Sequence, residues 1–594
     1  MKTKYIRIIC LWLVFAVCVS CQQETNPPGL SRQVLTYQDL MSADPGDTAI
    51  IGNRHFMPSE DAGAALHTFS GMLVIPTAPM MTTPAKIAPA NINGKATQTL
   101  PALGIEFFSV DGYLVPVVRD LLNHSDPDNF WQLQADPGRV WSEPDDNGMS
   151  RASFPFILTG DVEGDAWNAI ATFLYDDQGV SALRYQVVQH SAPYFITTPF
   201  TAAGFVDVTY DTLPTADRTG LVRAFQQELA DRTPIRPWSD LASQVGMEKL
   251  SDFDAGTKPE AVITSGLVID DVIYTRPFAT AAGDFPYPYG MRFGVWSMSK
   301  SMLGMVAMLR LAQKYGAEVF AYRIGDYLEV TAPHDGWNEV TFGDALNMAT
   351  GIGSGSDQLS PNNITDGYIY GDQQEYDRWY LAPSVREKLD YLFQNPNHDW
   401  GPGEHVRYRD RDIFALSAAM DSLIKRREGP DADIWRMMVE EVYTPLGIHR
   451  ISTKFTTEGN GQPGVLFLGW SLYVTVDDIS KISRLLQSGG SYKGRQLLHA
   501  GKLAEALYQT GIRGLPTGRS NTHGPGSYHM SLWHSPFTTD EGSQVSIPGF
   551  QGWGGMTVNL IPNGMTAYRL KNGGDEGPGM LEVANRIRPV EAKK

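Results

Sequence analysis

The order of strand-like and helical segments in the second half of the chain restricts the fold more than any other feature. From about residue 259, EAVITSGLVIDDVIYTRPF predicts two strands that turn at Asp270 and Asp271. SMSKSMLGMVAMLRLAQKYG then repeats apolar residues at helical spacing, and helices recur at 411–426 and 476–488. Strand patterns return in SYHMSLWHS, GGMTVNLIP and MTAYRLKN. Strands, then helices, then strands again predict an α+β layer domain.

The sequence before this region, from about residue 22, has a different pattern of apolar and polar residues. HTFSGMLVIPT, WNAIATFLYDD and GFVDVTYDTL are short alternating or apolar runs bounded by turn residues, which is typical of strands. A chain of 594 residues is expected to form two or more domains. We therefore predict a β-rich, sandwich-like accessory domain at 22–235, a linker at 236–258, and the α+β domain at 259–594.

The first residues have the features of an export signal. Basic residues in MKTKYIR precede the apolar run IICLWLVFAVCV, so 1–21 is predicted to be a signal peptide. Ser20 before Cys21 resembles the end of a bacterial lipobox, which implies lipidation of Cys21. The protein would then be exported and anchored as a bacterial lipoprotein facing the periplasm or the cell surface. Cys18 stands where leucine is usual, so an ordinary signal peptide or a short anchor is the alternative.

Composition excludes several classes of chemistry. All three cysteines lie in the first 21 residues, which rules out a disulfide, a thiolate nucleophile and a cysteine-based zinc site in the rest of the chain. The net charge of -18 argues against a nucleic-acid partner. The sequence has no P-loop, dinucleotide fingerprint or G-x-S-x-G, and His523, His529 and His534 fit no standard zinc spacing. We expect neither a metal nor an organic cofactor.

The pattern S-x-x-K occurs twice, as Ser297 with Lys300 and as Ser422 with Lys425. Residues i and i+3 share a helix face, so Lys300 can reach Ser297 across one turn and act as its base. Ser297 also begins an apolar helix, where backbone N–H groups can stabilise an oxyanion. Ser422 and Lys425 come late in a helix that ends at KRREG, and we interpret them as part of a solvated face.

The surroundings of the first copy resemble a known family. WSMSKS is similar to the catalytic segment of serine β-lactamases and penicillin-binding proteins, and most similar to the class C β-lactamase-related branch. That branch includes carboxylesterases, D-amino-acid peptidases and 6-aminohexanoate-oligomer hydrolases. Five more segments resemble the family's motifs in the same order: VTFGDALNMATGIGSG, GPGEHVRYRDRD, VYTPLGI, LGWSLYVTVDDISKISRLLQSGG and GFQGWGGMTVNLIP. The resemblance covers about 259–590 and implies a β-lactamase/transpeptidase-like fold, an antiparallel sheet with a helical subdomain.

The resemblance also implies roles for individual residues. Ser297 would be the acyl-accepting nucleophile, Lys300 its general-base partner, and Tyr408 the second acid/base group that carries a proton to the leaving group. The backbone N–H of Trp553, just after Gly552, would join that of Ser297 in an oxyanion hole. The alternative for Tyr408 is an ordinary half-buried tyrosine before a helix.

Two positions depart from the family pattern. Asp410 stands where the family has asparagine or serine, and its negative charge would favour a charged Lys300 or a cationic substrate group. Phe550, Gln551 and Gly552 replace the Lys-Thr-Gly or His-x-Gly of the last strand. That family cation often meets a substrate carboxylate, so its loss weakens the case for a penicillin and favours an ester or a neutral amide.

These features together predict an exported serine hydrolase that cleaves an ester or amide bond of a small-molecule or oligomeric substrate through an acyl-enzyme on Ser297. One alternative is a β-lactamase or D-Ala-type peptidase acting on cell-wall-like substrates. Another is a non-catalytic binding lipoprotein that retains the fold. The insertion 357–400 is either a cap that sets specificity at the cleft or a surface loop without a role.

Overall fold

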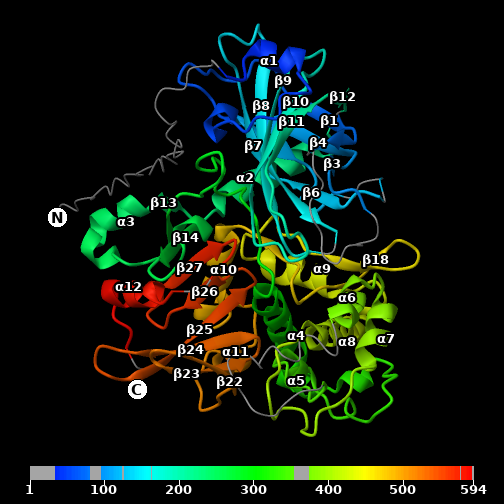
Figure 1. Ribbon diagram of the computed structural model, residues 1–594, viewed down its shortest axis with the longest axis vertical. Coiled ribbons are helices and arrows are strands. Elements are labelled where there is room, and N and C mark those ends of the chain that lie inside the picture. Colours follow the sequence, from blue (N-terminus) through cyan, green and yellow to red (C-terminus); the bar gives the residue numbers. More distant parts are fainter. Residues whose placement is uncertain are drawn as a thin grey trace, which may run out of the picture.

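The computed structural model describes residues 34–80, 95–122, 126, 128–161, 163–213, 215–353, 373–574 and 577–591. The predicted signal peptide, with Cys21, lies outside these residues. Figure 1 shows a β-rich part above, and below it a second sheet beside a group of helices. In the described parts of the chain, none of the helices combines the length and the apolar composition needed to cross a membrane.

The main sheet of the upper part has ten antiparallel strands in the order β11-β10-β9-β8-β7-β5-β4-β1-β12, with β6 paired to β8. A separate two-stranded sheet joins β2 (Ala78–Pro79) and β3 (Thr99–Leu100). Only residues 207 and 208 separate β11 from β12, which lie at opposite ends of the main sheet, so this sheet curls and brings the ends of its two edge strands close together. The predicted β-rich domain is present, but its main sheet is one continuous curled sheet and not the two stacked sheets of a sandwich. The strands are β1 (Ser70–Ile75), β4 (Leu103–Val110), β5 (Tyr113–Pro116), β6 (Trp131–Ala135), β7 (Gly138–Trp141), β8 (Ser150–Gly160), β9 (Trp167–Tyr175), β10 (Leu183–His190), β11 (Ala202–Val206) and β12 (Thr209–Thr212).

The segment expected as a linker belongs to the lower part instead. β13 (Ile235–Pro237) pairs in parallel with β15 (Val272–Thr275) at the edge of the second sheet. α3 (Trp238–Val245) and η2 (Met247–Leu250) follow, and Leu241 of α3 and Leu250 of η2 are buried against that sheet. The helix before this segment, α2 (Arg218–Ala230), packs Phe225 on the upper sheet.

The lower sheet has nine strands in the order β13-β15-β14-β27-β26-β25-β24-β23-β22 and is antiparallel apart from the β13–β15 pair. The predicted hairpin is present, and Asp270 and Asp271 both have positive φ, as a two-residue turn of this kind requires. The remaining strands are β14 (Val262–Ile269), β22 (Leu515–Asn521), β23 (Gly524–His529), β24 (Leu532–Thr538), β25 (Gln544–Gly552), β26 (Met556–Leu560) and β27 (Thr566–Lys571).

Helices cover both faces of this sheet. Leu267 and Ile269 of β14 pack toward α3 and α12 (Gly579–Ile587), while Val268 between them belongs to the main core on the other face. The predicted α+β fold, an antiparallel sheet with a helical subdomain, is thus confirmed. The helices on the core side include η4 (Lys300–Met305), α4 (Val306–Tyr315), α5 (Phe342–Leu346), α6 (Gln373–Leu381), α7 (Val385–Phe393), α8 (Asp410–Glu428), α9 (Ile434–Met438), α10 (Val476–Gln487) and α11 (Ala500–Ala506).

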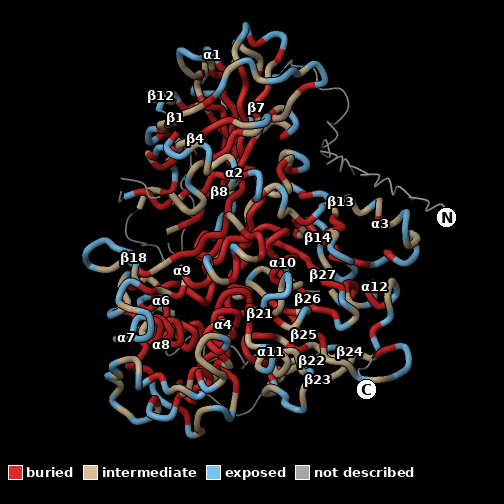
Figure 2. Tube along the Cα trace, turned by 180° about the vertical axis from the view of Figure 1, so that it is seen from behind, coloured by how far each residue is buried: buried red, intermediate tan, exposed pale blue. Residues whose placement is uncertain are grey.

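The two parts share one continuous core. Figure 2 shows buried chain running from β7 and β8 into the centre of the lower part. A buried ion pair crosses the boundary, where Arg292 Nε lies 2.6 Å from Asp136 Oδ2 and Nη2 donates to Oδ1 at 2.8 Å. Tyr473 of the lower part donates to the carbonyl of Glu163 at 2.9 Å. The N-terminal sheet is therefore fixed against the domain that carries the predicted site.

Candidate active site

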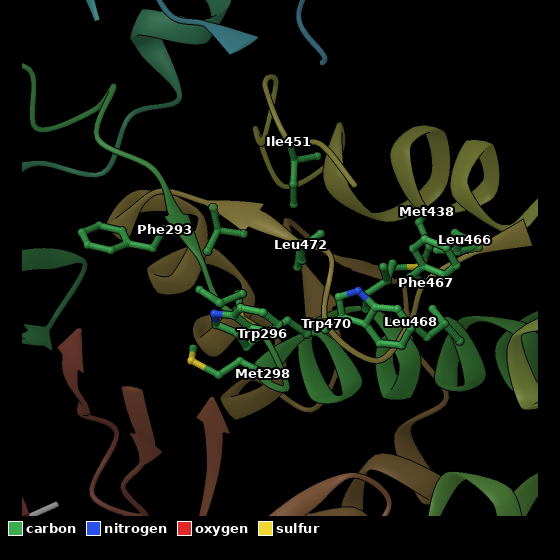
Figure 3. Close-up of a cluster of buried hydrophobic side chains, with 14 of the residues drawn as sticks. Phe293, Trp296, Met298, Met438, Ile451, Leu466, Phe467, Leu468, Trp470 and Leu472 are labelled. Carbon is green, nitrogen blue, oxygen red and sulfur yellow. The ribbon is translucent and has the colours of Figure 1, made fainter. Parts of the chain in front are cut away.

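Ser297 lies at a turn between a short strand and a buried helix. β16 (Phe293–Gly294) pairs with β19 (Tyr473–Val474), the chain turns at Trp296, and the helix begins at Met298. Figure 3 shows Trp296 and Met298 near Trp470 and Leu472 of the segment that leads into α10. In the stretch 291–309, Ser297 is the one residue that is not buried. The Ser297 hydroxyl is therefore accessible although the residues around it in the sequence are buried.

The residue before Ser297 has a strained backbone. Trp296 has a φ of 49°, in the left-handed region that bulky side chains rarely adopt. Such strain persists only where surrounding contacts fix the conformation, and it is common at functional sites. The peptide N–H of Ser297 is oriented by this turn.

Lys300 reaches Ser297 as its spacing predicts. Its Nζ donates to Ser297 Oγ at 2.8 Å and to the carbonyl of Gly469 at 3.0 Å. The same nitrogen lies 2.6 Å from Asp410 Oδ1. Both side chains of this ion pair are almost completely buried, at 0% and 2% exposure. The site therefore contains a Ser297–Lys300–Asp410 chain of contacts.

The charges in the site keep Lys300 protonated. Burial lowers the pKa of Lys300, but the negative charge of Asp410 and the contribution of Tyr408 outweigh it, so the pKa is raised. The expectation that Asp410 favours a charged Lys300 agrees with this direction. Asp410 is itself the first residue of α8, where the helix dipole favours an anion, and Tyr376 donates to its Oδ2 at 3.2 Å. A neutral Lys300, the form that a general base needs, is thus disfavoured at rest.

Tyr408 lies beside this pair. Lys300 Nζ is 4.7 Å from the centroid of the Tyr408 ring. The ring stacks on Trp533, with centroids 5.3 Å apart, and meets Tyr528 edge-on at 5.8 Å. The phenol of Tyr408 is therefore held next to the Lys300 cation, where a cation stabilises developing negative charge.

The end of β25 lies against the start of the Ser297 helix. A Cβ on Gly552 would come within 2.5 Å of the Val295 carbonyl oxygen, so glycine is what permits this approach. In the turns and loops of the described chain, no backbone hydrogen bond has the N–H of Ser297 or of Trp553 as its donor. These two N–H groups are therefore the candidates for the predicted oxyanion hole.

Phe550 stands where the resemblance places the family's substrate-binding cation, but its side chain is not at the site. Its side chain is fully buried in the main core, whereas its neighbour Gln551 lines the cavity described below. Alternation along the strand explains the difference, because successive side chains point to opposite faces. Phe550 is therefore a core residue and not a substrate-binding residue.

A cavity of about 950 Å³ is lined by residues of β22, β23, β24 and β25. Its wall includes Gly552, Trp553 and Trp533, together with Ala192 and Pro193 of the N-terminal domain. Among the described residues of the wall, Arg519 is the one with a fixed charge, since burial lowers the pKa of His534 to about 3. Its guanidinium lies 4.8 Å from the centroid of the Trp533 ring. Sequence reasoning missed Arg519, which occupies a strand with no motif around it.

The other predictions can be placed as well. Lys425 pairs with Asp421 at 2.6 Å near the end of α8, as expected for a solvated face rather than a site. The His534 ring stacks on Tyr508 with centroids 3.6 Å apart. Residues 354–372 of the predicted insertion lie outside the described residues. Its α6 does reach the site, through the bond from Tyr376 to Asp410.

Comparisons with known proteins yield only remote structural matches. No family model and no curated protein matches the sequence. A family VIII carboxylesterase is 15% identical, with a TM-score of 0.39 over 58% of this chain and 96% of its own. A D-stereospecific amidohydrolase from Streptomyces sp. is 15% identical, with a TM-score of 0.37 over 58% and 99%. A penicillin binding protein from Bacillus halodurans is 14% identical, with a TM-score of 0.37 over 57% and 98%. The roles assigned below therefore rest on the geometry of this chain.

Proposed function

We propose that this protein is a serine hydrolase of the β-lactamase-related type, which cleaves an ester or amide bond through an acyl-enzyme on Ser297. The observation that carries the proposal is the 2.8 Å contact between Lys300 Nζ and the Oγ of Ser297, the one residue of its segment that is not buried. A buried lysine beside an accessible serine at a helix start fits nucleophilic catalysis. We also propose export through residues 1–21 with lipidation at Cys21.

Activation of Ser297 requires a route for its proton. The Lys300 ammonium has no lone pair, so it must first lose a proton, and Asp410 Oδ1 is the carboxylate oxygen 2.6 Å away. We assign Asp410 as the acceptor of that proton. The neutral amine of Lys300 then takes the hydroxyl proton as Ser297 Oγ forms a bond to the substrate carbonyl carbon.

The remaining steps use Tyr408 and the two candidate oxyanion donors. The carbonyl oxygen becomes an oxyanion that accepts hydrogen bonds from the N–H groups of Ser297 and Trp553. The bond to the leaving group breaks, and Tyr408 gives that group a proton, leaving a tyrosinate beside the Lys300 cation. The tyrosinate then takes a proton from water as the water oxygen bonds to the acyl carbon, and the bond from that carbon to Ser297 Oγ breaks. Lys300 returns its proton to Ser297 Oγ, and Asp410 returns its proton to Lys300, which restores the starting state.

The charges near the site favour an ester or a neutral amide as substrate over a penicillin, with Arg519 as one positive charge on the cavity wall. Phe550 cannot supply the cation that binds the carboxylate of a penicillin, because its side chain carries no charge and is buried in the core. Arg519 places a positive charge elsewhere on the wall, and it suits an acidic group on the substrate. A second candidate function, cell-wall peptide or β-lactam hydrolysis, is favoured only by this charge.

Ser297→Ala is expected to abolish hydrolysis, because no other group can form the acyl-enzyme. Turnover would be measured with short-chain nitrophenyl esters, anilides, nitrocefin and D-amino-acid peptides, in neutral and carboxylate-bearing forms. We expect wild-type protein to cleave esters or anilides and Ser297→Ala to fall to the background rate. Equal turnover by both proteins would contradict the proposal, and turnover of nitrocefin alone would favour the second function. Ser422→Ala is the matched control and should retain full activity.

A further inference from the structure

A segment of the N-terminal domain forms part of the wall of the cavity beside Trp553. Residues 191–196 follow β10 and reach across the boundary between the domains. The Ala192 carbonyl accepts a hydrogen bond from the indole of Trp296 at 2.8 Å. The next carbonyl, of Pro193, accepts one from the indole of Trp553 at 3.0 Å. Two consecutive carbonyls of one domain thus hold two tryptophans of the other.

These two tryptophans stand next to the two N–H groups assigned to the oxyanion hole. Trp296 directly precedes Ser297, and its left-handed backbone sets the direction of the Ser297 N–H. Trp553 carries the second N–H itself. A strained turn needs outside contacts to hold it. The bond to Ala192 is one such contact, and Gly164 supplies another, since a Cβ there would lie 3.0 Å from the Trp296 ring.

Tyr194 completes the contact between the two tryptophans. Its ring meets Trp553 edge-on, with centroids 5.4 Å apart, and lies 6.2 Å from the ring of Trp296. The three rings come from three separate segments of the chain. Edge-on aromatic contacts of this kind fix relative orientation as well as distance.

Hydrogen bonds to a buried carboxyl group hold this segment in place. Glu163 is fully buried, and its carboxyl group accepts the backbone N–H groups of Tyr194 at 3.3 Å and Ile196 at 2.9 Å, together with that of Phe195. Lys454 of the C-terminal domain donates to the backbone carbonyl of Glu163 at 2.9 Å. Buried polar groups that are bonded in this way rigidify the surrounding chain.

We propose that Ala192, Pro193 and Tyr194 of the N-terminal domain position the oxyanion hole of the C-terminal domain. They act through Trp296 and Trp553, which are positioning residues: their indoles fix the peptide groups whose N–H donors face the oxyanion. The N-terminal sheet is then a required part of the catalytic unit rather than a separate binding module. The inference rests on the proposed function, because an oxyanion hole acts only if Ser297 forms a tetrahedral intermediate.

The test compares an ester with its thionoester on the full-length protein. Sulfur is a weak hydrogen-bond acceptor, so the hole contributes less to thionoester cleavage. Trp553→Phe keeps a ring and removes the N–H that Pro193 accepts, and Trp553 is 51% exposed, so the variant should fold. We expect kcat for the ester to fall about tenfold, less than the loss for removing a donor outright, with KM within about twofold. The kcat for the thionoester should fall by no more than about threefold.

Trp296→Phe is likewise expected to lower kcat for the ester more than kcat for the thionoester. Trp238→Phe, a matched change on α3 far from the segment, should leave both substrates unaffected. An equal fall in kcat for ester and thionoester, or an unchanged kcat, would overturn the inference while the proposed function stands. A wild-type protein that cleaves neither substrate would overturn both.

Discussion

Lys300→Met is expected to lower kcat/KM by about 10³-fold, because the variant has no group to take the Ser297 proton. Methionine has a similar length and suits the buried position, so the loss reflects the amine. The change also leaves the buried Asp410 without its cation, which is expected to reduce the free energy of unfolding by about 3–5 kcal/mol. Initial rates with a nitrophenyl ester and urea unfolding would measure the two effects.

The double variant Lys300→Met, Asp410→Asn separates chemistry from stability. Removing both charges should restore most of the free energy of unfolding, since no unpaired buried charge remains. The rate should stay at the level of Lys300→Met. A double variant that regains stability and also hydrolyses the ester at more than a tenth of the wild-type rate would contradict the assigned role of Lys300.

Asp410→Asn alone is expected to lower kcat/KM at neutral pH by about 10²-fold, because Lys300 loses the acceptor of its proton. The pH dependence should also change. In the wild type the pKa of Lys300 lies above its ordinary value, so Lys300 stays charged through neutral pH and its titration does not limit activity there. Without Asp410, burial lowers the pKa of Lys300, so Lys300 loses its proton at a lower pH than in the wild type. The activity of Asp410→Asn should therefore rise with pH as Lys300 becomes neutral.

The pH profile of kcat/KM checks this directly. Tyr376→Phe is the control, because it removes the hydrogen bond to Asp410 Oδ2 and keeps the carboxylate. It should change the rate by no more than a few fold. A rate and pH profile for Asp410→Asn equal to those of the wild type would show that Lys300 acts without Asp410.

Local features of the sequence predicted local structure well. The hairpin at Asp270–Asp271 and the helix after Ser297 follow from turn residues and apolar spacing, which act over a few residues. The contact of Lys300 with Ser297 is of the same kind, since i and i+3 meet in any helix. SYHMSLWHS was predicted as one strand, but Met530 and Ser531 have positive φ and split it into the hairpin of β23 and β24.

Long-range features were not predictable from the pattern. Alternating runs indicate strands but not whether they form one curled sheet or two stacked ones. The hydrogen bond from Trp296 to Ala192 joins residues 104 positions apart, and its acceptor is a backbone carbonyl, which has no sequence signature. Phe550 was placed at the site by its position in a motif, but its side chain points into the core. A motif gives a residue's position along the strand and not the face to which its side chain points.

The central claim is that Ser297 is the nucleophile of a covalent mechanism. The most direct test is intact-mass measurement after treatment with a fluorophosphonate, followed by peptide mapping. We predict one adduct per chain, located on Ser297, and no adduct in Ser297→Ala. An adduct on another serine, or equal labelling of Ser297→Ala, would contradict the account.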